Sequence, residues 1–116
     1  GATSYDGTDA QVKLLFTADS TDGSYVGYLI CKAIGTNIAT VLRVWLNNGS
    51  TNGTAGDNKL IKEWSLPATT ASATAATQDV RIPIDEWLNA SFRLYVGIGT
   101  TVASGWHINV GQSGKF

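Results

Sequence analysis

Charged residues are scarce in this chain, and the two signs are nearly balanced. Of its 116 residues, 15% are Asp, Glu, Lys or Arg, against about 25% in an average soluble domain. Eight basic and nine acidic residues leave a net charge of −1. Nucleic-acid binding needs clusters of Lys and Arg that neutralise phosphates, so that function is not expected. No apolar run approaches the roughly 18 residues of a membrane-spanning helix, so no membrane is expected as a partner.

Reactive side chains are scarcer still. Cys31 is the one cysteine and His107 the one histidine. A single cysteine excludes an internal disulfide, and its place in an apolar run predicts a buried thiol. One Cys and one His fall short of the usual ligand sets of zinc. Calcium is a less favoured alternative. The turns DGTD and DSTDG offer carboxylates, but these lack the spacing of an EF-hand loop. The carboxylates are those of Asp6, Asp9, Asp19 and Asp22. We expect no metal and no cofactor.

The same scarcity argues against an enzyme. His107 would have to serve as the base of a Ser-His-Asp hydrolase, and no nucleophile motif such as GxSxG accompanies it. Asp85 and Glu86 are adjacent, so on a strand they point to opposite faces and cannot flank one glycosidic bond. We predict a protein without catalytic activity, and a small hydrolase is the least favoured alternative.

What the chain does contain is a series of short β-type runs separated by Gly, Asn, Ser and Thr. The clearest is a strand over 38–46, a glycine-rich loop over 47–58 and a return strand over 59–66. Five further strands are predicted over 11–17, 25–34, 79–84, 91–99 and 106–110. DEWL, residues 85–88, predicts a single helical turn capped by Asp85.

These runs predict an all-β fold: an antiparallel two-sheet sandwich, jelly-roll-like, with about seven to eight strands and at most one helical turn. Residues 1–10 are small and polar and predict an N-terminal arm. Residues 11–116 predict a single β-sandwich domain. The chain begins at Gly1, which allows either a removed leader or further residues upstream.

Several residues carry finer predictions. Arg43 and Glu63 are expected to pair across neighbouring strands. Gly27 predicts a bulge or a close approach of another backbone, and Pro83 predicts an edge strand or a strand end. Residues 68–77 predict a flexible connector. The 47–58 loop is longer than a usual hairpin loop and predicts an exposed, mobile tip that Asn-Gly could replace without loss of folding.

The four tryptophans are the residues most suggestive of binding. Exposed aromatic rings stack against sugar faces, so a glycan-binding module using Trp45 or Trp64 is one hypothesis. The alternative, favoured for most of them, is that tryptophans fill the core and interfaces. As partner-binding candidates we take five aromatic residues: Tyr5, Trp45, Trp64, Trp87 and Phe116.

Five stretches of the chain, considered together, resemble one family. They are LLFTADSTDGSYVGYLICKAIGTN, ATVLRVWLNNG, LIKEWSLPATTASATAA, IPIDEWLNASFRLYVGIGTT and GWHINVGQ. Together they are similar to small phage and prophage virion structural proteins of the jelly-roll decoration, or cement, type. The similarity extends from about Val12 to Gly111, and it lies in turn and core residues. The 47–58 loop is longer here than in the shorter members.

The resemblance implies a non-enzymatic capsid decoration protein on the outer surface of a bacteriophage virion. It implies binding to the major capsid protein and self-association as a homotrimer, and it supplies no catalytic residue. A glycan-binding β-sandwich on a phage tail or fibre is the alternative.

Overall fold

The computed structural model describes residues 5–115, and of Lys115 the backbone alone. Every strand predicted from the sequence is present, and the protein is all-β. The elements in chain order are β1 (Lys13–Thr17), β2 (Ser24–Ala33), β3 (Thr40–Asn47), the 3₁₀ turn η1 (Ala55–Asp57), β4 (Asn58–Leu66), β5 (Val80–Leu88), β6 (Arg93–Ile98) and β7 (Trp106–Lys115). Within the described part of the chain, no helix is long and apolar enough to cross a membrane.

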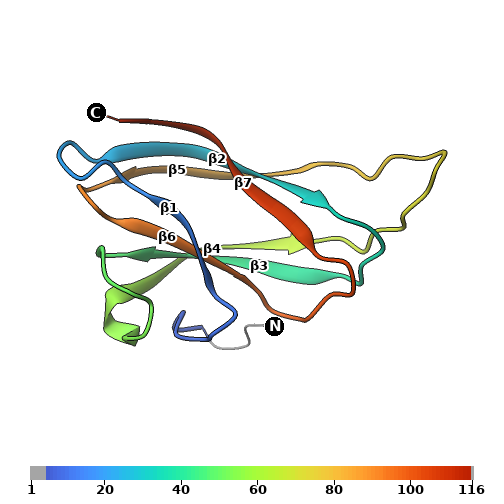
Figure 1. The fold of residues 1–116 in the computed structure, drawn as a ribbon, viewed down its shortest axis with the longest axis horizontal. Helices are drawn as coiled ribbons and strands as arrows, with labels where there is room; N and C mark the ends of the chain where they lie inside the picture. Colours follow the sequence, from blue (N-terminus) through green and yellow to red (C-terminus); the bar gives the residue numbers. More distant parts are fainter. Residues whose placement is uncertain (1–4, 116) are drawn as a thin grey trace.

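The strands form two antiparallel sheets. One has the order β1-β6-β3-β4 and the other β5-β2-β7. Consecutive strands alternate between the sheets, except that β3 and β4 form a hairpin. Figure 1 shows the sheets almost edge-on, with β2 and β5 in one layer, β3, β4 and β6 in the other, and β1 and β7 crossing in front. This arrangement confirms the predicted antiparallel two-sheet sandwich.

The core fills the space between the sheets because each strand turns alternate side chains inward. Ile82 and Ile84 of β5, with Leu88, face the other layer, while Pro83 between them is exposed. β5 is an edge strand, as Pro83 predicted. The fully buried aliphatic side chains of this core are Val26, Leu29, Leu42, Val44, Leu66, Ile82, Leu88 and Leu94.

A smaller apolar cluster lies on the outer face of the four-stranded sheet. Trp45 is fully buried there with Val12 and Tyr95. The predicted N-terminal arm covers it, and the Trp45 indole Nε1–H donates to the backbone carbonyl of Tyr5 at 2.9 Å. The four-stranded sheet is therefore covered on its inner face by the other sheet and, around Trp45, on its outer face by the described N-terminal residues.

The predicted helical turn over 85–88 is wrong, because β5 continues through it to Leu88. Two residues, Ile84 and Asp85, stand opposite the single Gly27 of β2, which is the predicted bulge. Asp85 takes a left-handed conformation with φ 49°. The bulge absorbs the extra residue, so the chain has no need to leave the strand.

Most residues of the 47–58 loop are exposed, as predicted, but side-chain hydrogen bonds hold the loop against neighbouring segments. The Asn47 side chain is fully buried and donates to the carbonyl of Thr51 and to Oδ1 of Asn58. Asn52 and Asn58 donate to the carbonyls of Gly7 and Asp6. Hydrogen bonds from the loop's own asparagines therefore fasten it to the N-terminal segment, a role that its polar composition did not reveal.

The connector between β4 and β5 is the segment that extends furthest from the sheets (Figure 1). Residues 71–76 and 78 are exposed. Its base is held by paired backbone hydrogen bonds between Asn37 and Thr69 and by a hydrogen bond from Lys32 Nζ to the Thr77 carbonyl.

Candidate binding surface

The outer face of the three-stranded sheet carries the most conspicuous exposed aromatic group. Trp87, on edge strand β5, has 66% of its surface exposed. It pairs across the ladder with Tyr25 of β2, and the two ring centroids are 4.7 Å apart at an interplanar angle of 51°. Tilted pairs at this spacing are a favourable aromatic geometry. Neither ring is part of the core between the sheets.

The bulge at Gly27 explains why two tyrosines share this outer face. Simple alternation groups Val26 with Tyr28 and places Tyr25 with Leu29. The register shift between Val26 and Tyr28 reverses this grouping. Val26 and Leu29 are fully buried, whereas Tyr25 and Tyr28 remain partly exposed. Toward β7 the extra residue is Gly27 itself, because Val26 pairs with Ser113 and Tyr28 with the adjacent Gln112, and this places both tyrosines outward.

Polar side chains fix the positions of these rings. The Tyr25 hydroxyl donates to Oδ1 of Asp85 at 2.8 Å. This hydrogen bond is the main reason that the pKa of Tyr25 is raised, with burial and the Asp85 charge adding to it. The Arg81 guanidinium lies over the Tyr28 ring, 4.7 Å from its centroid, a cation–π contact. We call Tyr25, Tyr28, Arg81, Asp85 and Trp87 the aromatic strip.

Glycines of β7 leave the strip open on its other side. Gly114 stands opposite Tyr25, and a side chain there would meet open space. Gly111 lies against the Tyr28 ring so closely that a Cβ would overlap it. The strip is therefore a shallow aromatic surface on the outer face of the three-stranded sheet.

The other sequence candidates lie elsewhere. Trp45 is fully buried, so its ring is not available to a partner. Trp64 is half-buried and packs against the main core. Tyr5 is 61% exposed, but on the opposite sheet from Trp87. Phe116 lies outside the described residues. The structure therefore does not bring the five together, and only Trp87 belongs to the strip.

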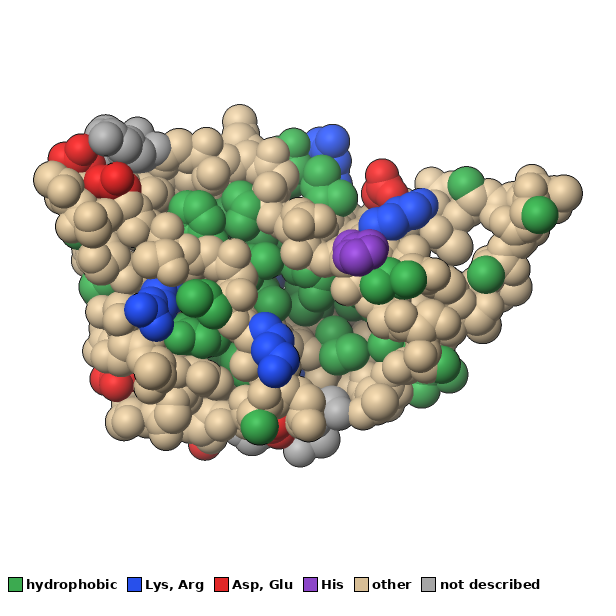
Figure 2. All heavy atoms as spheres, in the orientation of Figure 1, with side chains coloured by type: hydrophobic (Ala, Val, Ile, Leu, Met, Phe, Trp, Pro, Cys, Tyr) green, Lys and Arg blue, Asp and Glu red, His purple; other side chains and the backbone are tan. Residues whose placement is uncertain are grey.

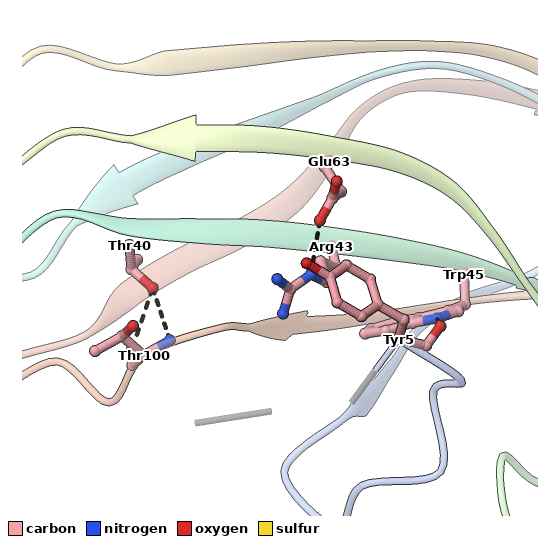
Figure 3. A network of polar contacts seen from close by, with 6 residues as sticks. All are labelled: Tyr5, Thr40, Arg43, Trp45, Glu63 and Thr100. Atoms are coloured by element: carbon pink, nitrogen blue, oxygen red, sulfur yellow. Dashed lines mark hydrogen bonds and ion pairs between the residues drawn. The ribbon is translucent and has the colours of Figure 1, made fainter. Parts of the chain in front are cut away.

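A polar network on the four-stranded sheet holds Tyr5 in place (Figure 3). Arg43 Nε donates to Oε1 of Glu63 at 2.8 Å, which confirms the predicted cross-strand pair. The Tyr5 ring lies 4.3 Å from the guanidinium carbon. The hydrogen bond to Glu63 raises the pKa of Arg43 above its usual value. Thr40 and Thr100 are also hydrogen-bonded to each other in this view. The contact with Arg43 anchors Tyr5 of the N-terminal segment, while the other two contacts join β3 to β4 and to the residues after β6.

The candidates for metal and acid–base chemistry are dispersed. Asp6, Asp9 and Asp19 accept hydrogen bonds from backbone N–H groups two or three residues later, as turn-forming aspartates do. His107 is exposed on β7, opposite Lys32. Among residues 5–115, no three His, Cys, Asp or Glu side chains lie close enough together to hold a metal ion.

Comparison with protein-family models, with curated proteins and with solved structures found no match for this chain.

Proposed function

We propose that this chain is a non-enzymatic virion structural protein that binds the major capsid protein on the outer surface of a phage shell, as a decoration or cement protein. The family resemblance supplies the partner. The observation that carries the proposal is the aromatic strip, an exposed Trp–Tyr–Arg surface on a rigid sheet.

The composition of the strip is that of a protein–protein hot spot. Trp, Tyr and Arg are the residues that most often dominate the binding free energy of protein interfaces. Leaving a ring like that of Trp87 66% exposed forfeits stability that burial would supply, so its exposure is best explained by a partner that covers it.

The strip is also ordered before any partner arrives. Tyr25 is held by Asp85 on one side and by the Trp87 ring on another, and both β2 and β5 are anchored in the core by fully buried side chains. Such preorganisation reduces the entropy lost on binding. It suits a protein whose task is to bridge neighbouring subunits of a shell.

Co-sedimentation with purified capsids that lack this protein tests the proposal. We expect Trp87→Ala to weaken capsid binding by roughly thirtyfold or more, the loss typical of a hot-spot residue. Ile38→Ala, which truncates a 58% exposed side chain outside the strip, is the matched control. The wild-type protein failing to bind capsids would reject the proposal. The mass of the free protein tests the homotrimer implied by the resemblance.

Glycan binding is the second candidate, and a specific feature of the strip favours it. Trp87 packs against the Tyr25 ring, and the Tyr25 hydroxyl donates to the Asp85 carboxylate, so an aromatic platform lies near hydrogen-bonding groups of the kind that bind sugar hydroxyls. In this second candidate function the sugar would bind at Trp87 rather than at Trp45 or Trp64.

A glycan array distinguishes the two functions. Sugar binding that is lost in both Trp87→Ala and Asp85→Asn, together with no binding to capsids, would establish the second candidate. Capsid binding that is sensitive to Trp87→Ala, with an array that stays blank, would exclude it.

A further inference from the structure

The exposed edges of the two sheets are not equally protected. An edge strand presents unpaired backbone N–H and C=O groups, and proteins usually shield such edges with short strands, charges, prolines or bulges. β1 has five residues and a register shift after Leu14. β4 carries Lys59, Lys62 and Glu63. β5 contains Pro83 and the bulge at Asp85.

β7 is the exception among these four edge strands. It has ten residues, and residues 106–114 include neither proline nor Asp, Glu, Lys or Arg. Its pairing with β2 shifts register twice, on either side of Tyr28, but residues 106–110 pair with Leu29–Ala33 in unbroken register. This regular, uncharged part of the edge is about 17 Å long at the usual rise per residue, and such an edge is a template for pairing with another strand.

Beneath this edge lies an apolar cleft. It runs between β1 and β7 and has a volume of about 290 Å³. Leu14 on the β1 side is 49% exposed, and Lys13 and Gln11 also line the cleft. Figure 2 shows hydrophobic side chains gathered in the middle of this face of the molecule, where Figure 1 places β1 and β7 in front. The apolar lining consists of Leu14, Leu15, Val96, Ile98, Trp106 and Ile108.

We propose that β7 is a self-association edge, on which β7 of a second copy pairs antiparallel about a two-fold axis. The pair continues the three-stranded sheet into six strands. In a continuous sheet, the second copy's inward side chains lie on the same side as Trp106 and Ile108. They therefore extend over the apolar cleft and remove it from water.

The sequence of β7 is what selects a second copy as the occupant. Trp106, Ile108 and Val110 alternate with His107 and Asn109 and pack against their own core. Since Trp106 and Ile108 also line the cleft, two-fold pairing of β7 sets the apolar clefts of the two copies side by side. Because residues 106–114 carry no Asp, Glu, Lys or Arg, antiparallel self-pairing over them sets no like charges opposite one another. The edge strand β5 is a poorer template for such pairing, because Pro83 has no backbone N–H to donate.

This arrangement has a definite stoichiometry. An isologous two-fold contact closes with two copies, so it predicts a dimer where the family resemblance predicts a homotrimer. The inference is independent of the proposed function, because β7 and the aromatic strip are separate surfaces and each has its own variants.

Sedimentation equilibrium over a range of protein concentrations tests the pairing. We expect a dimer for the wild-type chain and at least about tenfold weaker association for Asn109→Lys, which adds like charges to the paired strands. High salt should restore part of that loss by screening the added charges. Leu14→Lys, which places a charge in the cleft, should weaken the dimer similarly. The matched controls are Ser65→Lys on the exposed part of β4 and Ile38→Lys, an exposed apolar position outside the cleft.

Hydrogen exchange provides a second readout. In the dimer, more amide protons of β7 should exchange slowly than in the dilute monomer, while β4 and β5 amides should be unchanged. A monomer at every concentration, a trimer, or a dimer insensitive to both Asn109→Lys and Leu14→Lys would each overturn the inference.

Discussion

Trp45 and Trp106 both pack against hydrophobic side chains, but their indole N–H groups differ. Nε1 of Trp45 donates to the Tyr5 carbonyl at 2.9 Å. Nε1 of Trp106 is buried and has no hydrogen-bond acceptor among the described residues. A made hydrogen bond contributes roughly 1 kcal/mol, whereas a buried donor without an acceptor costs about 1–3 kcal/mol. The two residues therefore respond oppositely to loss of the N–H.

We expect Trp45→Phe to destabilise the fold more than Trp106→Phe, by about 2 kcal/mol or more. Both changes remove similar volume from the ring, and the fuller burial of Trp45 adds to the difference in the same direction as the N–H group. Urea unfolding of the two variants measures it. Equal losses of stability would mean that the Trp106 N–H is satisfied in solution.

Cys31 makes stability depend on alkaline pH. It is fully buried, and burial raises the pKa of its thiol from 9.0 to about 11. The unfolded chain therefore loses this proton first, and the stabilisation is complete below about pH 9 and disappears as pH rises toward about 11. We expect the wild type to lose more stability over that range than Cys31→Ala, measured by urea unfolding. Parallel pH profiles for the two proteins would contradict this.

At the scale of elements, the single bulge at Gly27 decided how much of the surface could be predicted. Alternation correctly placed Ile82, Ile84 and Pro83 on β5 and paired Arg43 with Glu63, because those strands keep their period there. On β2 the bulge at Gly27 was predicted, but the reversal of the inward and outward side chains beyond it was not. A pattern of period two reverses after one inserted residue, so the aromatic strip was missed.

The 47–58 loop shows a different limit. Its Gly, Asn, Ser and Thr composition is typical of flexible loops, and composition cannot show that its asparagines have backbone partners in residues 5–9. Those partners are distant in sequence, with 45 residues separating Asn52 from Gly7. The same composition serves a mobile loop and a fastened one.

We expect Asn47→Ala to cost about 2–3 kcal/mol of stability. The amide makes two donated hydrogen bonds and accepts one from the Gly49 N–H, all from a fully buried position, and removing it leaves buried groups without partners. Asn48→Ala is the control, since Asn48 is exposed and donates to Asp57. Its cost should stay below about 1 kcal/mol. Thermal unfolding measures both.

Replacing the whole loop with Asn-Gly should now be strongly destabilising. It removes the asparagines that hold the N-terminal segment and the carbonyl of Ser50 that accepts from Arg93 and Tyr95. A replacement that melts at the wild-type temperature would restore the original view of the loop as a dispensable tip.

For the molecule as a whole, the described N-terminal residues are part of the folded unit. Deleting residues 1–9 uncovers the fully buried Trp45, and re-exposing part of an aromatic side chain costs about 2–4 kcal/mol. Circular dichroism melting of the deletion variant tests this. Tyr5→Ala keeps the backbone carbonyl that Trp45 uses and should lose less. A deletion variant as stable as the wild type would show that the arm is dispensable for folding.

The sandwich class was predictable because turn residues and period-two patterns recur along the entire chain. The binding surface could not be predicted in the same way, because such surfaces consist of exposed residues whose grouping depends on bulges and sheet edges. Trp87 lies in a stretch that was interpreted as a helical turn, and simple alternation grouped its neighbour Tyr25 with Leu29, which the structure buries.

The position of β7 also governs when the protein can fold. β2 is the central strand of its sheet, and one of its two neighbours, β7, is the last of the seven described strands. A nascent chain lacks that neighbour until β7 has been synthesised. Most strand pairs likewise join distant segments, which slows folding to the millisecond-to-second range typical of all-β domains. The sheet is therefore expected to complete its pairing only after β7 has been made, and the outer edge of β7 stays open to other chains from then on.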